Sequence, residues 1–187
     1  MYNAVSYTHL TLAGFSLPTT LIAQSAPRQP NVVIIVADDL GYGDLSCYGA
    51  HRIQTPGMDR IANEGIRFTQ GYCTAATSTP SRYSLLTGLY PWTNRDAKIL
   101  PGNAALIINT QQVTLPKVMK QAGYVTGSVG KWHLGLGDGV VDWNKLVYPG
   151  AKEIGYDYSF IQAATNDRVP CIFICLLYTS DAADEED

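Results

Sequence analysis

The stretch from Thr74 to Gly88, TAATSTPSRYSLLTG, sets Ser78, Pro80 and Arg82 at two-residue steps where a helix should begin. A hydroxyl residue, Ser78 or Thr79, suits the cap of such a helix, and Pro80 suits its first turn. Neither role requires Arg82. The free N–H groups at a helix start attract anions, and an arginine about one turn further on can pair with an anion or orient a group at that start. The stretch therefore fits either a capped helix with a surface arginine or a helix start that does chemistry.

Two further sets of polar residues follow apolar segments. Asp38 and Asp39 come directly after the run NVVIIVA. Adjacent carboxylates repel each other unless water or a cation separates them, and a hard ion such as Ca²⁺ or Mg²⁺ suits such a pair. Lys131 and His133 follow a later apolar segment, and their i, i+2 spacing on extended chain lets both face one site. Taken alone, each pair is also compatible with a solvated turn.

Predicted strands and helices alternate along the chain, which indicates an α/β protein with a largely parallel sheet. The β-branched run at 31–37 is typical of a strand buried on both faces. Strands are also expected at 66–72 and 124–129, and helices at 55–64 (Thr55 as its cap, Gly65 after it), 80–87 (Gly88 after it) and 114–122. Because sites in open α/β sheets form at the carboxyl ends of strands, the polar sets should meet there. Residues 89–113 and 134–155 are expected to be loop-rich.

Taken together, these segments closely resemble the sulfatase family, the formylglycine-dependent members of the alkaline-phosphatase superfamily. The resemblance covers most of residues 31–135, in the order expected of the family, and includes the full pattern S-x-P-S-R-x-x-L-x-T-G. It is carried by NVVIIVADDLGYGDLSCYG (31–49), TPGMDRIANEGIRFTQGYC (55–73), STPSRYSLLTGLYP (78–91) and LPKVMKQAGYVTGSVGKWHLG (115–135). A later stretch, GYDYSFIQAATNDRVP (155–170), is also similar to the family. Its Asp167 and Arg168 could line a substrate pocket, but the sequence assigns neither of them a role.

The resemblance implies a role for the serine of the signature. Ser78 is identified with the residue that a maturing enzyme oxidises to formylglycine, and its being a serine implies a radical-SAM maturase. A hydrated aldehyde carries two hydroxyls on one carbon: one can attack sulfur, and deprotonation of the other can expel sulfate. The implied activity is hydrolysis of a sulfate ester of a carbohydrate or an aryl alcohol.

The resemblance also implies partners for that residue. Asp38, Asp39 and the modified Ser78 would be ligands of Ca²⁺ rather than Mg²⁺. Arg82 would hold the formylglycine hydroxyl, and Lys131 would contact both formylglycine and sulfate. His133 would bind the second hydroxyl and could assist its deprotonation.

The implied fold is alkaline-phosphatase-like, with a mostly parallel central sheet flanked by helices, here truncated. The family's later Asp-Asn metal pair, later histidine and later lysine have no match before the chain ends. Two carboxylates and one serine-derived oxygen fall short of the roughly six or more oxygen ligands that Ca²⁺ takes. We therefore expect this fragment, tested as residues 27–174, to bind calcium weakly and to lack turnover.

Two other functions stay open from the residues alone. The same fold with an unmodified Ser78 could act as a phosphomonoesterase or phosphodiesterase. A non-catalytic module that binds sulfated glycans is the second alternative. Binding alone, however, would not require the signature around Ser78.

The two ends of the chain have a different character. AVSYTHL near the start and CLLYTS near the end are encoded in two frames by one nucleotide string that resembles a transposon-based sequencing adapter. We interpret residues 1–11 and 175–187 as such sequence, 12–26 as the remnant of a secretory signal peptide, and 27–174 as the N-terminal part of a sulfatase catalytic domain. This order predicts a periplasmic or secreted protein.

Composition limits the classes of partner. The 187 residues are 46% hydrophobic and 16% charged, with a formal net charge of −3, which is ordinary for a globular protein and unlike a nucleic-acid-binding protein. No segment is expected to span a membrane. The four cysteines show no zinc-site spacing.

Overall fold

The computed structural model describes residues 29–168, 171–175 and 178–180. The chain divides into two units, Met1–Ala37 and Asp38–Asp187, and all the elements described below belong to the second. The predicted adapter-like residues 1–11, the predicted leader at 12–26 and most of the predicted tail at 175–187 lie outside the described residues.

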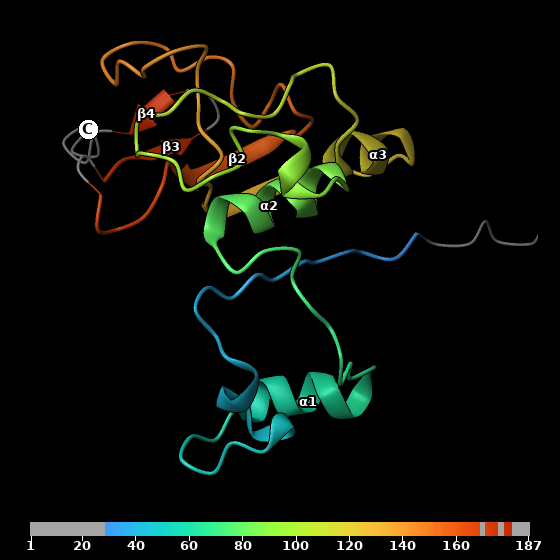
Figure 1. Cartoon of the computed structure of the whole chain (residues 1–187). Helices are drawn as coiled ribbons and strands as arrows, with labels where there is room; N and C mark the ends of the chain where they lie inside the picture. The colour runs from blue at the N-terminus through green and yellow to red at the C-terminus, as the bar shows by residue number, and fades with distance from the viewer. Residues whose placement is uncertain (1–28, 169–170, 176–177, 181–187) are drawn as a thin grey trace, which may run out of the picture. The chain divides into compact units, whose positions relative to one another are not determined.

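The described residues of the second unit form three α-helices, three short 3₁₀ helices and one sheet (Figure 1). The α-helices are α1 (Pro56–Glu64), α2 (Ser78–Thr87) and α3 (Leu115–Gln121). The 3₁₀ helices are η1 (Tyr42–Asp44), η2 (Ser46–Tyr48) and η3 (Pro91–Thr93). The strands are β1 (Gly127–Lys131), β2 (Tyr158–Gln162), β3 (Phe173–Cys175) and β4 (Tyr178–Ser180).

All three predicted helices are present, because the residues that delimit them act locally. Gly88 follows α2 in the left-handed region at φ +69°, and α1 and α3 each have a proline in the first turn. The prediction for Thr55 is half right. It occupies the N-cap position of α1, but its hydroxyl makes no capping bond to the backbone and instead contacts Asp59 and Ser46.

Two of the three predicted strands are absent. Residues 31–37 form no strand, and Val32, Ile34 and Val36 are at least half exposed. Residues 66–72 also form no strand, and the carbonyl of Phe68 accepts a hydrogen bond from the Tyr48 hydroxyl. A strand requires a neighbouring strand for its backbone groups, which an apolar pattern alone does not provide. The third predicted strand, 124–129, is present, but it begins and ends later in the sequence than predicted, because β1 covers Gly127–Lys131.

The sheet has the order β1-β2-β3-β4 and is mixed. Strands β1 and β2 are parallel, with Lys131 opposite Gln162, whereas the β2–β3 and β3–β4 pairs are antiparallel. The α/β class is confirmed, and the parallel pair is the part that matters for the site. Because β1 and β2 end at the same edge, the segments that follow Lys131 and Gln162 leave the sheet side by side.

The core packs α2 and two long loops against this sheet. Tyr83 and Leu86 of α2 are buried with Ile161 of β2 and Ile174 of β3. The remaining core residues come largely from the predicted loop-rich segments or follow β1: Ile108, Trp132, Leu134, Leu136, Val147, Ala151 and Ile154. These loops therefore bury apolar side chains and fix the segment that carries His133.

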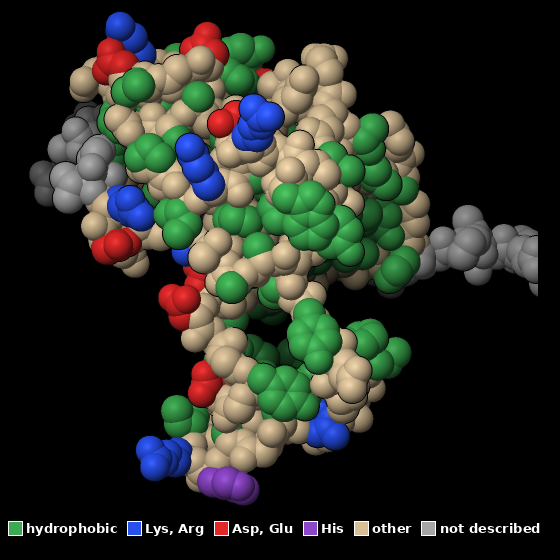
Figure 2. All heavy atoms as spheres, in the orientation of Figure 1, with side chains coloured by type: hydrophobic (Ala, Val, Ile, Leu, Met, Phe, Trp, Pro, Cys, Tyr) green, Lys and Arg blue, Asp and Glu red, His purple; other side chains and the backbone are tan. Residues whose placement is uncertain are grey.

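Many apolar side chains also reach the surface, and Figure 2 shows them between the charged groups. Tyr90 and Trp92 stack with ring centroids 4.1 Å apart while both remain exposed. Within the part of the chain that the structure describes, no helix combines the length and the apolar character that crossing a bilayer would need.

Candidate active site

Ser78 is the first residue of α2, one position after the N-cap. Thr77 occupies the N-cap with an extended backbone, so the expectation that Ser78 or Thr79 caps the helix is wrong. Thr79 instead is fully buried and donates its hydroxyl to the carbonyl of His133 at 2.8 Å. The start of α2 is thereby attached to the segment after β1, and the hydroxyl of Ser78 is free for other contacts.

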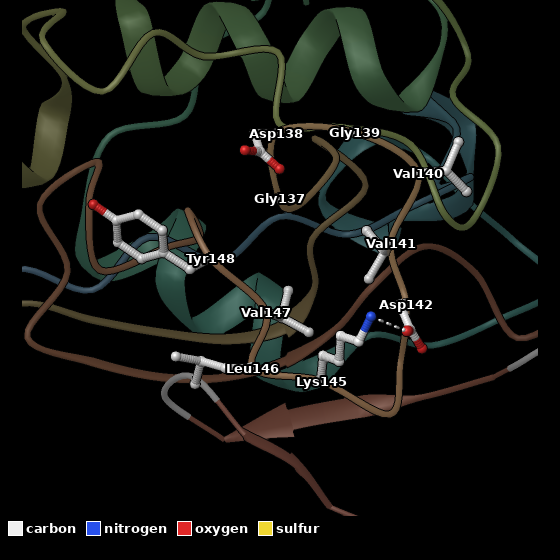
Figure 3. Close-up of a pocket in the computed structure, with 10 residues that line it drawn as sticks. All are labelled: Gly137, Asp138, Gly139, Val140, Val141, Asp142, Lys145, Leu146, Val147 and Tyr148. Atoms are coloured by element: carbon white, nitrogen blue, oxygen red, sulfur yellow. Dashed lines mark ion pairs between the residues drawn. The ribbon is translucent and has the colours of Figure 1, made fainter.

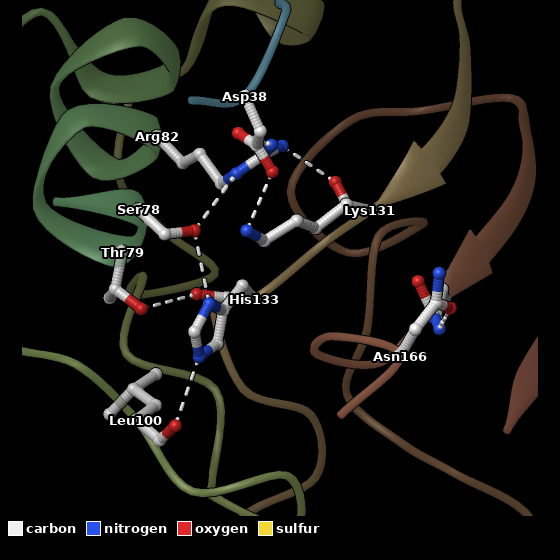
Figure 4. Close-up of polar contacts among 9 residues, drawn as sticks. Asp38, Ser78, Thr79, Arg82, Leu100, Lys131, His133 and Asn166 are labelled. Carbon is white, nitrogen blue, oxygen red and sulfur yellow. Dashed lines mark hydrogen bonds and ion pairs between the residues drawn. The ribbon is translucent and has the colours of Figure 1, made fainter. Parts of the chain in front are cut away.

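Arg82 lies four residues after Ser78, on the same face of α2. Its Nε donates to Ser78 Oγ at 3.2 Å, and its Nη1 donates to the carbonyl of Lys131 at 2.7 Å. Its Nη2 donates to Asp38 Oδ1 at 2.8 Å. One guanidinium therefore contacts three predicted site residues, as Figure 4 shows.

Lys131, the last residue of β1, completes the pairing of Asp38. Its Nζ lies 2.6 Å from Asp38 Oδ2, so the two carboxylate oxygens face two different cations. Burial raises the pKa of Asp38, but the hydrogen bonds and charges of Lys131 and Arg82 outweigh this and hold the pKa below its usual value. The cluster of Asp38, Arg82 and Lys131 keeps a net positive charge.

His133 is buried, and its ring lies between Ser78 at the start of α2 and the backbone of Leu100. Its Nδ1 is 3.0 Å from Ser78 Oγ, and its Nε2 is 2.9 Å from the carbonyl oxygen of Leu100. A carbonyl can only accept, so Nε2 carries the proton and Nδ1 accepts from the Ser78 hydroxyl. The expectation that Lys131 and His133 reach one site through extended backbone is wrong, because His133 has φ +55° and lies in the left-handed region.

The surroundings of His133 favour the neutral ring. Burial is the largest effect and lowers the pKa of His133. The positive charges of Lys131, Arg168 and Arg82 lower it further, while the contact with the Leu100 carbonyl raises it. A neutral imidazole with an accepting Nδ1 can take a proton from the atom that occupies the Ser78 Oγ position.

Asp39 is the predicted site residue that the structure does not bring into the cluster. It is exposed, with φ +56°, and makes no hydrogen bond or ion pair with another described residue. Among the described residues no group of three or more His, Cys, Asp or Glu side chains could hold a metal ion. Since both oxygens of Asp38 already face cations, Asp38, Asp39 and Ser78 do not fit a calcium ion by themselves.

Three contributions to the site are not visible in the residue pattern. The carbonyl of Leu100 fixes the His133 tautomer, and the buried hydroxyl of Thr79 holds the His133 backbone. A backbone carbonyl carries no signal of residue type, so the first could not be predicted. The third is the charge of Arg168, which acts on His133, whereas the sequence indicated Arg168 only as a residue that could line a substrate pocket.

A separate hollow is formed by one loop, residues 137–142 and 145–148 (Figure 3). Its polar side chains include Asp142 and Lys145, which pair with each other at 3.1 Å. None of the predicted site residues lines this hollow. The cluster around Ser78 is therefore the candidate active site.

Comparison with curated proteins gives consistent matches. The chain is 56% identical over 148 residues to an N-acetylgalactosamine-6-O-sulfatase of Bacteroides thetaiotaomicron, which covers 79% of this chain and 29% of the relative. It is 45% identical over 111 residues to arylsulfatase A of Homo sapiens, covering 59% of this chain and 22% of that protein. The chain thus spans less than a third of the length of these relatives.

Solved structures agree with these matches. A structure determined in work on the metabolism of multiple glycosaminoglycans by Bacteroides thetaiotaomicron superposes with a TM-score of 0.80 at 54% identity, over 81% of this chain and 32% of that one. A structure of Ps i-CgsB in complex with k-i-k-neocarrahexaose superposes with a TM-score of 0.63 at 31% identity, over 74% of this chain and 29% of that one. The family model named Sulfatase matches residues 30–169, three quarters of the sequence, and on these grounds the chain belongs to the sulfatase family.

Proposed function

We propose that this chain carries part of the active site of a hydrolase that cleaves sulfate esters of carbohydrates. The observation that carries the proposal is the position of Ser78 Oγ, 3.0 Å from His133 Nδ1 and 3.2 Å from Arg82 Nε. A nucleophile held between a proton acceptor and a cation is the arrangement that covalent catalysis on an oxyanion ester needs.

Two residues around position 78 have different roles: one accepts a proton and the other orients the oxygen. His133 accepts the proton of the group at position 78, because its Nε2 is committed to Leu100 and its Nδ1 is free to accept. General base catalysis of this kind contributes about 10²–10⁴-fold to a rate. Arg82 holds the same oxygen from the opposite side and fixes its direction.

Positive charge for the sulfate group comes from Lys131 and Arg82. Both side chains are mostly buried, with exposures of 21% and 15%, and both point at Asp38. Charges already oriented in a partly dry site stabilise a developing anion without reorganising. Oxidation of Ser78 to formylglycine would supply a hydrated aldehyde, whose second hydroxyl provides a route for releasing the sulfate, and the contacts of Ser78 Oγ with one donor and one acceptor fit such a hydroxyl.

The relatives' names support a substrate class for the proposal. One relative is named an N-acetylgalactosamine-6-O-sulfatase and another an N-acetylglucosamine-6-O-sulfatase, at 56% and 44% identity, and one structural relative is bound to a neocarrahexaose. We therefore propose a sulfated carbohydrate, with aryl sulfates as the second substrate class. Export to the periplasm or the medium, and maturation by a radical-SAM enzyme, are further parts of the proposal that come from the sequence alone.

Mass spectrometry tests the central step directly. The full chain is co-expressed with a radical-SAM sulfatase-maturing enzyme and cut with trypsin, and the peptide Phe68–Arg82 is weighed. Conversion of Ser78 removes two hydrogens, a loss of about 2 Da. The Ser78→Ala variant is the matched control and should keep its mass.

The outcomes separate the candidate functions. Conversion of Ser78 supports the proposal. An intact Ser78 combined with cleavage of an aryl phosphate would support the phosphoesterase alternative, and binding of a sulfated glycan with neither conversion nor cleavage would support the binding module. Either of the last two results overturns the proposed function.

A further inference from the structure

A third cation, Arg168, lies beside the candidate active site. It follows β2, and β1 and β2 are parallel with Lys131 opposite Gln162. The pairing continues past the strands, because the N–H of His133 donates to the carbonyl of Ala163 at 3.1 Å. The segment that leads to Arg168 therefore starts directly alongside His133.

A turn brings Arg168 back toward the site. The N–H of Arg168 donates to the carbonyl of Thr165 at 3.1 Å, which closes a turn after β2. A Cβ atom placed on Gly102 would lie 3.7 Å from Cβ of Arg168, so the two backbones approach closely. Gly102 is two residues after Leu100, whose carbonyl holds His133 Nε2. Arg168 and His133 thus both lie against the same short loop.

The side chain of Arg168 has an unused donor. Its Nε is buried and has no hydrogen-bond acceptor among the described residues. A buried donor of a charged group without an acceptor is costly, and native structures rarely retain one unless a ligand or water satisfies it. The charge of Arg168 also acts on His133. Burial is the largest cause of the lowered pKa of His133, and the positive charge of Arg168 lowers that pKa further.

We propose that Arg168 binds an oxyanion group of the sulfated substrate, as a further substrate-binding residue next to Lys131 and His133. Arginine presents a planar fork that matches sulfate or carboxylate oxygens, and its Nε–H is one arm of that fork. The oxyanion is either the sulfate that is cleaved or a second acidic group on the same sugar chain. This inference rests on the proposed function, because it assigns a role within the same site.

NMR on the full chain observes the donor itself. The Nε–Hε signal of Arg168, assigned by its loss in Arg168→Lys, is followed while N-acetylgalactosamine 6-sulfate, unsulfated N-acetylgalactosamine or inorganic sulfate is added. The signal should move in a saturable way with the sulfated sugar and stay in place with the unsulfated one. A matching response to inorganic sulfate assigns Arg168 to the sulfate itself, and a response to the sugar sulfate alone assigns it to a site that also requires the sugar.

Affinity provides the second readout. Arg168→Gln should weaken binding of the sugar sulfate by about tenfold or more, and Arg168→Lys by less, because lysine keeps the charge and loses the fork. Arg95→Lys, at an exposed position, is the matched control and should leave the affinity unchanged. Backbone spectra of each variant check that the fold is retained.

The possible failures are distinguishable. If the sugar sulfate binds with equal affinity to the wild type and both Arg168 variants, or if the Arg168 Nε signal does not move in the wild type, the inference is wrong. The proposed function is judged separately by the mass of the Ser78 peptide, which does not depend on Arg168.

Discussion

His133 Nδ1 lies 3.0 Å from Ser78 Oγ, while His133 Nε2 lies 2.9 Å from the carbonyl of Leu100. We expect His133 to be neutral near pH 7, because burial lowers its pKa, and to carry its proton on Nε2, because the Leu100 carbonyl can only accept. Long-range ¹H–¹⁵N NMR of the imidazole reports the tautomer, with exposed His51 as an internal reference. Ser78→Ala should shift the Nδ1 signal and leave Nε2 protonated. A proton found on Nδ1 would contradict the assignment.

Arg82 bridges α2, β1 and Asp38, so its removal should reduce stability as well as disturb the site. In Arg82→Ala the carbonyl of Lys131 loses its donor and Asp38 keeps one cation. We expect the free energy of unfolding to fall by about 1–3 kcal/mol in urea denaturation. Arg60→Ala removes an arginine whose pair with Glu64 is largely exposed, and it should change stability by less than about 0.5 kcal/mol. Equal effects of the two substitutions would show that the bridge contributes nothing.

Gly135 is expected to be the least replaceable glycine near the site. Its φ is +75°, and an added Cβ would lie 1.8 Å from the carbonyl oxygen of Ala105. Gly88 has a similar φ of +69° but open space around it, so Gly88→Ala isolates the backbone cost of about 1–2 kcal/mol. Gly135→Ala should cost clearly more and displace Trp132, whose indole donates to the Gly135 carbonyl at 2.8 Å. Thermal unfolding and tryptophan fluorescence measure both effects, and similar melting temperatures for the two variants would argue against the clash.

Asp157 should make stability depend on pH in acid. The Lys120 ammonium at 2.6 Å, followed by the backbone N–H of Thr126 at 2.9 Å, lowers the pKa of Asp157 to about 2. The unfolded chain therefore binds this proton more readily than the folded one, and the contribution to stability is present above pH 3.8 and lost as pH falls toward about 2. Asp157→Asn should flatten the pH dependence of unfolding in this window, whereas Asp96→Asn, on the exposed surface, should not. An unchanged profile for Asp157→Asn would rule out this linkage.

Calcium should bind this chain weakly. Both oxygens of Asp38 face cations, and Asp39 lies apart from the cluster. With a dissociation constant of about 1 mM or weaker, about 1 mM Ca²⁺ stabilises by no more than about 0.4 kcal/mol, or roughly 1 °C in melting temperature. Melting curves with Ca²⁺ and with EDTA test this, and Asp38→Asn is the control. A shift of several degrees that disappears in Asp38→Asn would show a calcium site formed by these residues.

The sequence predicted the helices better than the strands for a physical reason. Prolines and glycines at the ends of α1, α2 and α3 act within one turn, so the pattern contains what each helix needs. The run at 31–37 contains the side chains of a strand but not its neighbour, and it remains exposed. Pairing partners lie elsewhere in the sequence, and the apolar pattern does not identify them.

For the site, residue types and spacing predicted that Asp38, Ser78, Arg82, Lys131 and His133 belong together, and the structure brings these five into contact. The backbone conformation that brings His133 to the site differs from the predicted one, because His133 is in the left-handed region and not in an extended strand. Asp39 was grouped with Asp38 because the two are adjacent, yet its position at φ +56° leaves it outside the cluster. Adjacency in sequence does not fix the direction of two side chains at a turn.

The hydrogen bond from Thr79 Oγ1 to the His133 carbonyl joins residues 54 positions apart, at a buried position. Together with the Ser78 and Arg82 contacts, it makes the first turn of α2 and the end of β1 one cooperative opening unit. Amide protons on both segments should then show the same free energy of opening in hydrogen exchange, and a destabilising substitution in either segment should lower it in both.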